Sequence, residues 1–242
     1  MRTRALVSLL GLAAVSAASA VAQGYTVNAT GYYTLVLPPG FTLIANQLNA
    51  MTNTVAMVLA DQLPDGAVLY KLDPVTAQYS ANRYNRYDPS QPGNWDDPSQ
   101  NLNPGEGAFL WIPGPSSVKL IILGELSQGT LTLALPQGLS LASSIVPQTD
   151  ILTADGVHTN GVHGGLGFPA ADGDMIYRFH DATDIFGDPL HRRLTSQYSI
   201  HQWIGPNPGG QWDDPPIIGV GEGFIVLKRE AVAWVRTFSV NG

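Results

Sequence analysis

The motif Trp-Asp-Asp-Pro occurs twice in this chain of 242 residues, and each copy is followed by Gly-Glu-Gly and an apolar run. The first copies lie at 95–98 and 105–107, and the second copies lie at 212–215 and 221–223. The interval from the Trp to the first Gly is ten residues in one copy (95 to 105) and nine in the other (212 to 221). A match in both identity and order predicts two copies of one structural unit.

The composition indicates which kind of unit is repeated. The chain has 26 Gly and 18 Pro, so it turns often and leaves little room for long helices. We therefore expect an all-β protein of two tandem, pseudo-symmetric small β-barrels or sandwiches, with repeat 1 at 23–126 and repeat 2 at 127–242. The joint at 124–129 is too short to act as a flexible tether, so the two units should pack closely.

Alternating apolar and polar residues predict the individual strands, beginning with 27–37 and 41–45. The Pro-Pro-Gly segment between these two strands predicts a tight reversal. Residues 52–59 form the best helix candidate, with Thr52 or Asn53 as its cap. Further strands are expected at 67–72, 118–123, 130–135, 139–142, 174–179 and 234–240.

The N-terminus has the features of an export signal. Arg2 and Arg4 precede an apolar stretch at 5–17, and small residues at 18–22 suit a signal peptidase. We expect cleavage after Ala22 and a secreted, periplasmic or cell-surface protein. The alternative is a membrane anchor, which the short apolar core disfavours. No membrane insertion is therefore expected after cleavage. The chain has no cysteine and a net charge of -7, which argues against disulfides and against nucleic-acid partners.

The repeated motifs admit a functional and a structural interpretation. Paired carboxylates can hold Ca²⁺ or serve as acid and base. The favoured interpretation is structural: the first Asp caps a turn, the Pro ends a strand and the Trp fills the core. Gly-Glu-Gly is expected to form a turn and bulge that opens a strand, because phosphate-binding glycine loops precede a helix and here an apolar strand follows.

All five histidines lie in the second copy, which makes this copy the better place for a specialised site. His158 and His163, with Asp155, are candidate ligands for one divalent metal, Zn²⁺, Cu²⁺ or Ca²⁺. Their Gly-rich loop matches no zinc signature, so a solvated loop and no cofactor are the favoured interpretation.

A catalytic set can also be drawn in the second copy. Ser199 and His201 are two residues apart on a predicted strand and should share one face, with Asp213 or Asp214 downstream. The chain has no Gly-x-Ser-x-Gly elbow, and a set drawn from so many Ser, His and Asp residues carries little weight.

Aromatic residues next to polar loops are candidates for stacking on sugar rings. The alternative is that the strands bury these rings in the core. The candidate ligand-binding residues are Tyr84, Tyr87, Trp95, Trp203 and Trp212, and Tyr79 and Tyr198 belong to the same class of aromatics.

The order of motifs resembles a module of exported bacterial surface proteins. That module has a Gly-aromatic-polar-Leu-Ile opening, a Tyr-Lys strand, a Trp and a Gly-x-Gly-aromatic strand. Matching segments lie at 40–44, 70–71, 95 and 105–109 in the first copy, and at 138–142, 177–178, 212 and 221–224 in the second. Leu139 and Ala108 depart from the usual aromatics. The resemblance implies an exported β fold and supplies no catalytic residue.

Two functions remain as hypotheses. The first is an exported non-catalytic protein, structural or ligand-binding, whose partner is an extracellular glycan or a second copy of itself. The second is a secreted hydrolase, with or without the assistance of a metal, whose site lies in repeat 2. The hydrolase hypothesis requires the polar groups of the 155–167 loop to converge with Asp213 or Asp214 in one pocket.

Overall fold

The computed structural model describes residues 29–152, 165–180, 194–195, 198–206 and 209–240. The predicted signal peptide at 1–22 and the histidine loop around His158 and His163 lie outside the described residues. We call residues 29–126 the first half and residues 127–240 the second half.

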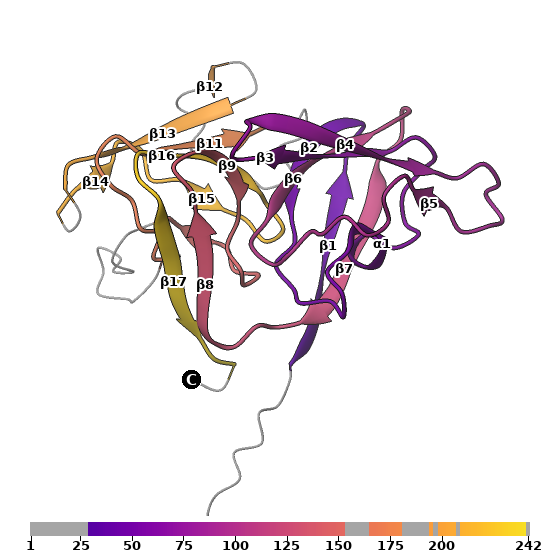
Figure 1. Ribbon diagram of the computed structural model, residues 1–242, viewed down its shortest axis with the longest axis horizontal. Helices are drawn as coiled ribbons and strands as arrows, with labels where there is room; N and C mark the ends of the chain where they lie inside the picture. Colours follow the sequence, from indigo (N-terminus) through magenta and orange to yellow (C-terminus); the bar gives the residue numbers. More distant parts are fainter. Residues whose placement is uncertain (1–28, 153–164, 181–193, 196–197, 207–208, 241–242) are drawn as a thin grey trace, which may run out of the picture.

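The protein is all-β, and its sheets are antiparallel (Figure 1). The strands of the first half are β1 (Thr30–Leu37), β2 (Gly40–Ala45), β3 (Val68–Asp73), β4 (Gln78–Asn85), β5 (Asn94–Trp95), β6 (Gly107–Ile112) and β7 (Val118–Glu125). Those of the second half are β8 (Gly129–Leu135), β9 (Gly138–Ala142), β10 (Asp150–Ile151), β11 (Met175–Phe179), β12 (Leu194–Thr195), β13 (Tyr198–Ile204), β14 (Gln211–Trp212), β15 (Ile217–Ile218), β16 (Phe224–Lys228) and β17 (Val232–Phe238).

The two large sheets have corresponding strand orders. The five-stranded sheet runs β2-β6-β3-β4-β5, and the six-stranded sheet runs β9-β16-β11-β13-β12, with β14 also paired to β13. The register corresponds too, because Tyr70 faces Phe109 in the first sheet and Tyr177 faces Ile225 in the second. The two sheets lie side by side along the top of the view in Figure 1.

A two-stranded ribbon packs beneath each large sheet. β1 pairs with β7 in the first half and β8 pairs with β17 in the second, and both ribbons descend from the sheets in Figure 1. Apolar side chains between each ribbon and its sheet form the core, with Leu37, Leu69 and Leu120 in the first half and Leu135, Ile176 and Trp234 in the second. Of the two expected architectures, the described strands form open, sandwich-like layers and no closed barrel.

The Pro-Pro-Gly segment does not form the tight reversal expected from the sequence. β1 pairs with β7 and β2 pairs with β6, so Pro38 and Pro39 carry the chain from one sheet into another instead of closing a hairpin. Gly40 has φ +98 and Gly138, at the matching corner of the second half, has φ +91. Glycine adopts this conformation without steric cost, which explains its place at both corners.

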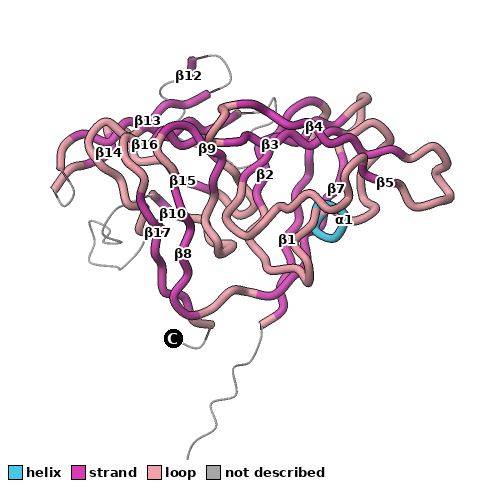
Figure 2. Tube along the Cα trace, viewed as in Figure 1, coloured by secondary structure: helices cyan, strands magenta, loops and turns pink. Residues whose placement is uncertain are grey.

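Figure 2 shows the single described helix, α1 (Val55–Val58), beside β7. It is shorter than the predicted 52–59 segment, and Thr54 is its N-cap instead of Thr52 or Asn53. Asn53 instead has φ +47 and accepts a hydrogen bond from the Ala50 amide on its side-chain oxygen. No helix in the described part of the chain is long and apolar enough to cross a membrane.

The halves are joined by reciprocal backbone contacts. Edge strand β2 forms a bridge from Ile44 to Glu222, and edge strand β9 forms the matching bridge from Ala142 to Glu106. The amide of Ala45 donates to the Gly221 carbonyl at 2.9 Å. Each Gly-Glu-Gly segment therefore pairs with the edge strand of the opposite half.

The motif glycines permit this approach. A Cβ on Gly223 would lie 2.7 Å from the Ile44 carbonyl oxygen and 3.3 Å from the Cα of Gly107. A Cβ on Gly221 would lie 2.8 Å from the Tyr33 ring. The glycines are required because two backbones pack against each other where the halves meet.

Candidate binding site

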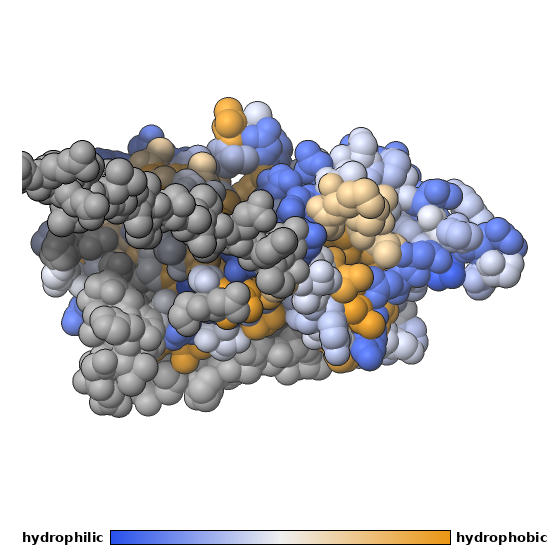
Figure 3. Space-filling model, turned by 90° about the horizontal axis from the view of Figure 1, so that it is seen from below, coloured by the Kyte–Doolittle hydropathy of each residue, from blue (hydrophilic) through white to orange (hydrophobic). Residues whose placement is uncertain are grey.

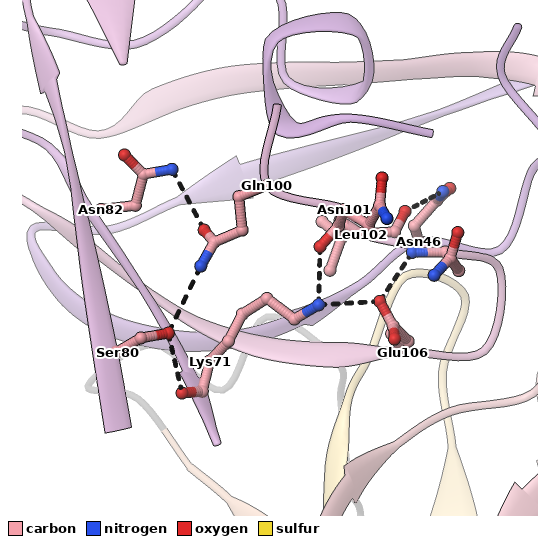
Figure 4. A network of polar contacts seen from close by, with 9 residues as sticks. Asn46, Lys71, Ser80, Asn82, Gln100, Asn101, Leu102 and Glu106 are labelled. Atoms are coloured by element: carbon pink, nitrogen blue, oxygen red, sulfur yellow. Dashed lines mark hydrogen bonds and ion pairs between the residues drawn. The ribbon is translucent and has the colours of Figure 1, made fainter. Parts of the chain in front are cut away.

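The glutamates of the Gly-Glu-Gly motifs form ion pairs inside the fold. Glu106 accepts from Lys71 at 2.9 Å, and the same carboxylate oxygen accepts from the Asn103 amide at 2.8 Å (Figure 4). Glu222 receives two hydrogen bonds from the Arg178 guanidinium, at 2.7 and 3.0 Å. The second pair is buried, with each side chain 1% exposed, whereas Lys71 is 20% and Glu106 33% exposed. The two glutamates therefore join the motif to β3 and β11 and have a structural role.

The Trp-Asp-Asp-Pro motifs are also structural. Trp95 packs on Tyr84 with ring centroids 5.3 Å apart. Asp97 accepts from the Ser99 hydroxyl at 2.6 Å and from the Ser99 amide at 3.0 Å, and these bonds lower the pKa of the Asp97 carboxyl. In the first copy, the second Asp therefore caps the turn. The expectation that the first Asp caps it was wrong, because Asp96 instead accepts from the Asn85 side chain at 2.8 Å.

Four of the five candidate sugar-binding aromatics are buried. Tyr84, Trp95, Trp203 and Trp212 are at most 5% exposed, so their ring faces are covered by the core. Trp203 and Trp212 pack edge to face at 5.4 Å, while the matching rings Tyr84 and Trp95 in the first half are tilted at 59° to each other. Tyr87 is the exception, at 93% exposed.

Ser199 and His201 do meet, as their spacing on one strand predicts. The Ser199 hydroxyl lies 3.0 Å from Nε2 of His201 and 2.9 Å from Nε2 of His180. Nδ1 of His201 donates to the backbone carbonyl of Asp214 at 2.6 Å. In a neutral His201, the other ring nitrogen, Nε2, then accepts a hydrogen bond from the Ser199 hydroxyl.

This chain of side chains serves as a brace and is closed to substrate. Ser199 is 3% and His201 is 2% exposed. At the matching place in the first half, Asn82 donates to the Asp97 carbonyl at 2.7 Å, just as His201 donates to the Asp214 carbonyl. Both contacts tie a Trp-Asp-Asp-Pro segment to its sheet. Asp213 contributes similarly, because its carboxylate accepts from the Gln202 amide at 2.9 Å.

The brace predicts a stability effect at Ser199. Ser199→Ala removes a buried hydroxyl between two histidines and should lower the free energy of unfolding by about 1–3 kcal/mol. Ser80→Ala, at the exposed matching position, should cost less than about 0.5 kcal/mol. Urea denaturation of both variants measures the difference. Equal, small losses would contradict the bracing role.

The candidate metal ligands all belong to the 155–167 loop. His158, His163 and Asp155 lie outside the described residues. Among the residues whose structure is described, no group of three potential ligands could hold a metal ion.

Two hollows on the outer face of the side-by-side sheets form the best candidate site. The first has a volume of about 510 Å³ and the second about 420 Å³, both within the range of small-molecule sites. We call them the aromatic hollow and the aliphatic hollow. The aromatic hollow is lined by Phe41, Tyr70, Tyr79, Phe109, Phe179 and Tyr198. The aliphatic hollow is lined by Leu72, Ala77, Tyr79, Leu139, Tyr177, Tyr198, Ile200 and Ile225.

The aromatic rings brace one another across the joint between the halves. Phe109 of the first half and Phe179 of the second pack edge to face at 5.3 Å, and Phe179 packs against Tyr198 at the same distance. Phe41 lies 5.7 Å from Tyr70. The floor of the aromatic hollow is therefore a fixed array of rings, with Phe41 46% exposed at its edge.

The chemistry of both hollows is uncharged and partly polar. No Asp, Glu, Lys, Arg or His is among the described residues that line them. The hydroxyls of Tyr70, Tyr79 and Tyr198 form no hydrogen bond to another described residue, whereas that of Tyr177 contacts the Met175 sulfur at 3.2 Å. Burial raises the pKa of Tyr79 and of Tyr198, so both phenols stay protonated at neutral pH. The site offers ring faces and unpaired hydroxyls to a ligand.

A larger hollow lies between the helix and the first ribbon. It has a volume of about 790 Å³ and is lined by residues such as Met51, Met57 and Ile121. Apolar surface gathers in several places on the face seen from below (Figure 3). The described lining of this hollow contains no aromatic ring, so it offers no stacking surface.

Comparison with family models, curated proteins and solved structures found no match.

Sequence reasoning missed most of the aromatic face. Tyr79 and Tyr198 were grouped with the loop aromatics, but Phe41, Tyr70 and Phe109 were not identified as a surface. The sequence feature that could have identified this face is the alternation of side chains along a strand. Tyr70 and Leu72 lie on one side of β3, and Leu69 and Lys71 lie on the other side. Both sides carry large apolar side chains, so alternation alone does not show which side faces the core.

Proposed function

We propose that this chain is an exported, non-catalytic protein built from a duplicated β module, and that it binds carbohydrate on the outer face of its two large sheets. The observation that carries the proposal is the aromatic hollow, whose six described lining residues are all aromatic and come from both halves. Duplication is supported by the corresponding strand orders of the two sheets. Export is supported by the N-terminal sequence at 1–22.

Carbohydrate fits the chemistry of this face. A sugar ring has an apolar face that packs on an aromatic ring and hydroxyls at its rim that hydrogen-bond. The tyrosines that line the aromatic hollow supply both kinds of contact, since each has a ring face and a hydroxyl. A purely apolar ligand would bury these hydroxyls without partners, which is energetically costly.

The absence of a reactive group at this face supports a binding role over hydrolysis. Among its described lining residues, no carboxylate or imidazole stands ready as an acid or base. The Ser199–His201 pair lies in the buried brace instead. Asp213 and Asp214 likewise belong to the segment that the brace ties down.

Binding to an array of neutral and acidic glycans, followed by calorimetry on the best ligand, tests the proposal. Tyr79→Ala should weaken binding about threefold to tenfold, because it removes a half-exposed ring that lines both hollows. Tyr87→Ala is the matched control, since Tyr87 is 93% exposed and lines neither hollow, and it should leave the Kd unchanged. Loss of binding in Tyr87→Ala alone would place the sugar at the loop after β4 and refute the proposed site.

A further inference from the structure

The aromatic and aliphatic hollows share a common wall. Tyr79 and Tyr198 line both of them, and the pKa of Tyr79 is raised by burial and, to a smaller extent, by the nearby Tyr198 phenol. Tyr79 comes from β4 and Tyr198 from β13, which are corresponding strands of the two sheets. The tyrosine pair therefore lies where the two halves face each other.

The hollows correspond residue by residue through the sheet registers. Tyr79 faces Leu72 in the first sheet, and Tyr198 faces Phe179 in the second. Phe41 and Leu139 each follow the corner glycine by one residue. The matching pairs are Phe41 with Leu139, Tyr70 with Tyr177, Leu72 with Phe179, Tyr79 with Tyr198, and Phe109 with Ile225. If each residue that lines the aromatic hollow is replaced by the other member of its pair, the result is six of the residues that line the aliphatic hollow. Tyr79 and Tyr198 line both hollows, so this pair counts twice.

The two hollows nevertheless differ in chemistry. Three phenylalanines of the aromatic hollow are replaced by Leu139, Ile225 and Leu72 in the aliphatic hollow. A ring face stacks best on aromatic side chains, while aliphatic side chains provide contact area without that preference. A ligand that spans both hollows is therefore bound in one direction.

From this arrangement we infer that the face takes a neutral glycan of at least two sugar units, with one unit stacked in the aromatic hollow and the next against the aliphatic hollow. Tyr79 and Tyr198 lie between the two units, and their hydroxyls hydrogen-bond to the ligand at the junction. The ligand is neutral because an acidic or basic sugar would find no opposite charge among the described lining residues. This inference rests on the proposed function and specifies the size and charge of its ligand.

Calorimetry with a series of one, two and four sugar units of the neutral glycan that binds best in the array tests the inference. Two units should bind about tenfold more tightly than one, because the second hollow adds a further set of contacts, and four units should add little beyond two. Affinity should be unchanged between low and high NaCl, since no charge pairs are formed. Equal affinity for one and two units, or a strong loss of affinity in salt, overturns the inference.

Two matched variants separate the hollows. Phe41→Ala alters only the aromatic hollow and Leu139→Ala only the aliphatic one, and both side chains are exposed, at 46% and 41%, so the fold should be retained. For two units, each variant should weaken binding severalfold; for one unit, only Phe41→Ala should do so. If Leu139→Ala has no effect with any ligand while Tyr79→Ala does, the face has one subsite and the inference fails. If no glycan binds the wild-type protein, the proposed function itself fails.

Discussion

Glu222→Gln is expected to lower the free energy of unfolding by about 3–5 kcal/mol. The substitution removes the carboxylate that accepts two hydrogen bonds from the Arg178 guanidinium, which is 1% exposed. Gln keeps one oxygen that can still accept the 2.7 Å hydrogen bond from the Gly219 amide. The loss of stability is therefore due to the missing negative charge and not to the loss of this turn contact. Urea denaturation measures the change in the unfolding midpoint and in the slope of the unfolding free energy with denaturant.

Glu106→Gln is the control for this effect, because Glu106 occupies the same place in the first half. Its pair with Lys71 is partly exposed, at 20% and 33%, and solvent screening limits its contribution to about 0–1 kcal/mol. Arg178→Met combined with Glu222→Leu should recover much of the lost stability, since no buried charge then remains unpaired. Equal losses in the two single variants would show that burial does not distinguish the pairs.

Gly221→Ala is expected to have the second large effect, a loss of about 3–5 kcal/mol. Gly221 has φ +76, where a Cβ is strained, and that Cβ would lie 2.8 Å from the Tyr33 ring and 2.9 Å from the Leu35 side chain. These neighbours belong to β1 of the other half, so the substitution pushes the two halves apart. Thermal and urea unfolding measure the loss.

Gly138→Ala isolates the backbone contribution. Gly138 has φ +91 and no atom within 4 Å of its Cβ position, so only conformational strain of about 1–2 kcal/mol is expected. The remainder of the Gly221→Ala effect, about 1–4 kcal/mol, then measures packing across the joint. A Gly138→Ala loss as large as that of Gly221→Ala would contradict the role of Gly221 at the joint.

The sequence predicted the strands well and their pairing poorly. The alternation of residues in 27–37, 41–45 and 118–123 reports which side chains share a face, and β1, β2 and β7 lie where it places them. Pairing depends on contacts between residues far apart in the chain. Nothing local at Pro38 and Pro39 shows that β1 joins β7 and not β2, because a corner between sheets and a hairpin use the same turn residues.

The candidate site was less accessible from the sequence for a related reason. Trp95 and Trp212, which belong to the repeated motif, were candidate ligand-binding residues. Both rings are buried, so the repetition marks residues of the two cores. The members of the aromatic hollow differ between copies, as Phe109 and Ile225 do, so repetition does not mark them. Their common location becomes visible only when the two sheets lie side by side.

The reciprocal bridges from Ile44 to Glu222 and from Ala142 to Glu106 have the geometry of an isologous homodimer interface, in which each partner offers the same patch to the other. Here both patches belong to one polypeptide, so the effective concentration of one patch near the other does not depend on the protein concentration, and dilution cannot separate them. Because the partners are covalently linked, each side can change independently of the other. The difference between Phe109 and Ile225 is one that two identical subunits could not have acquired.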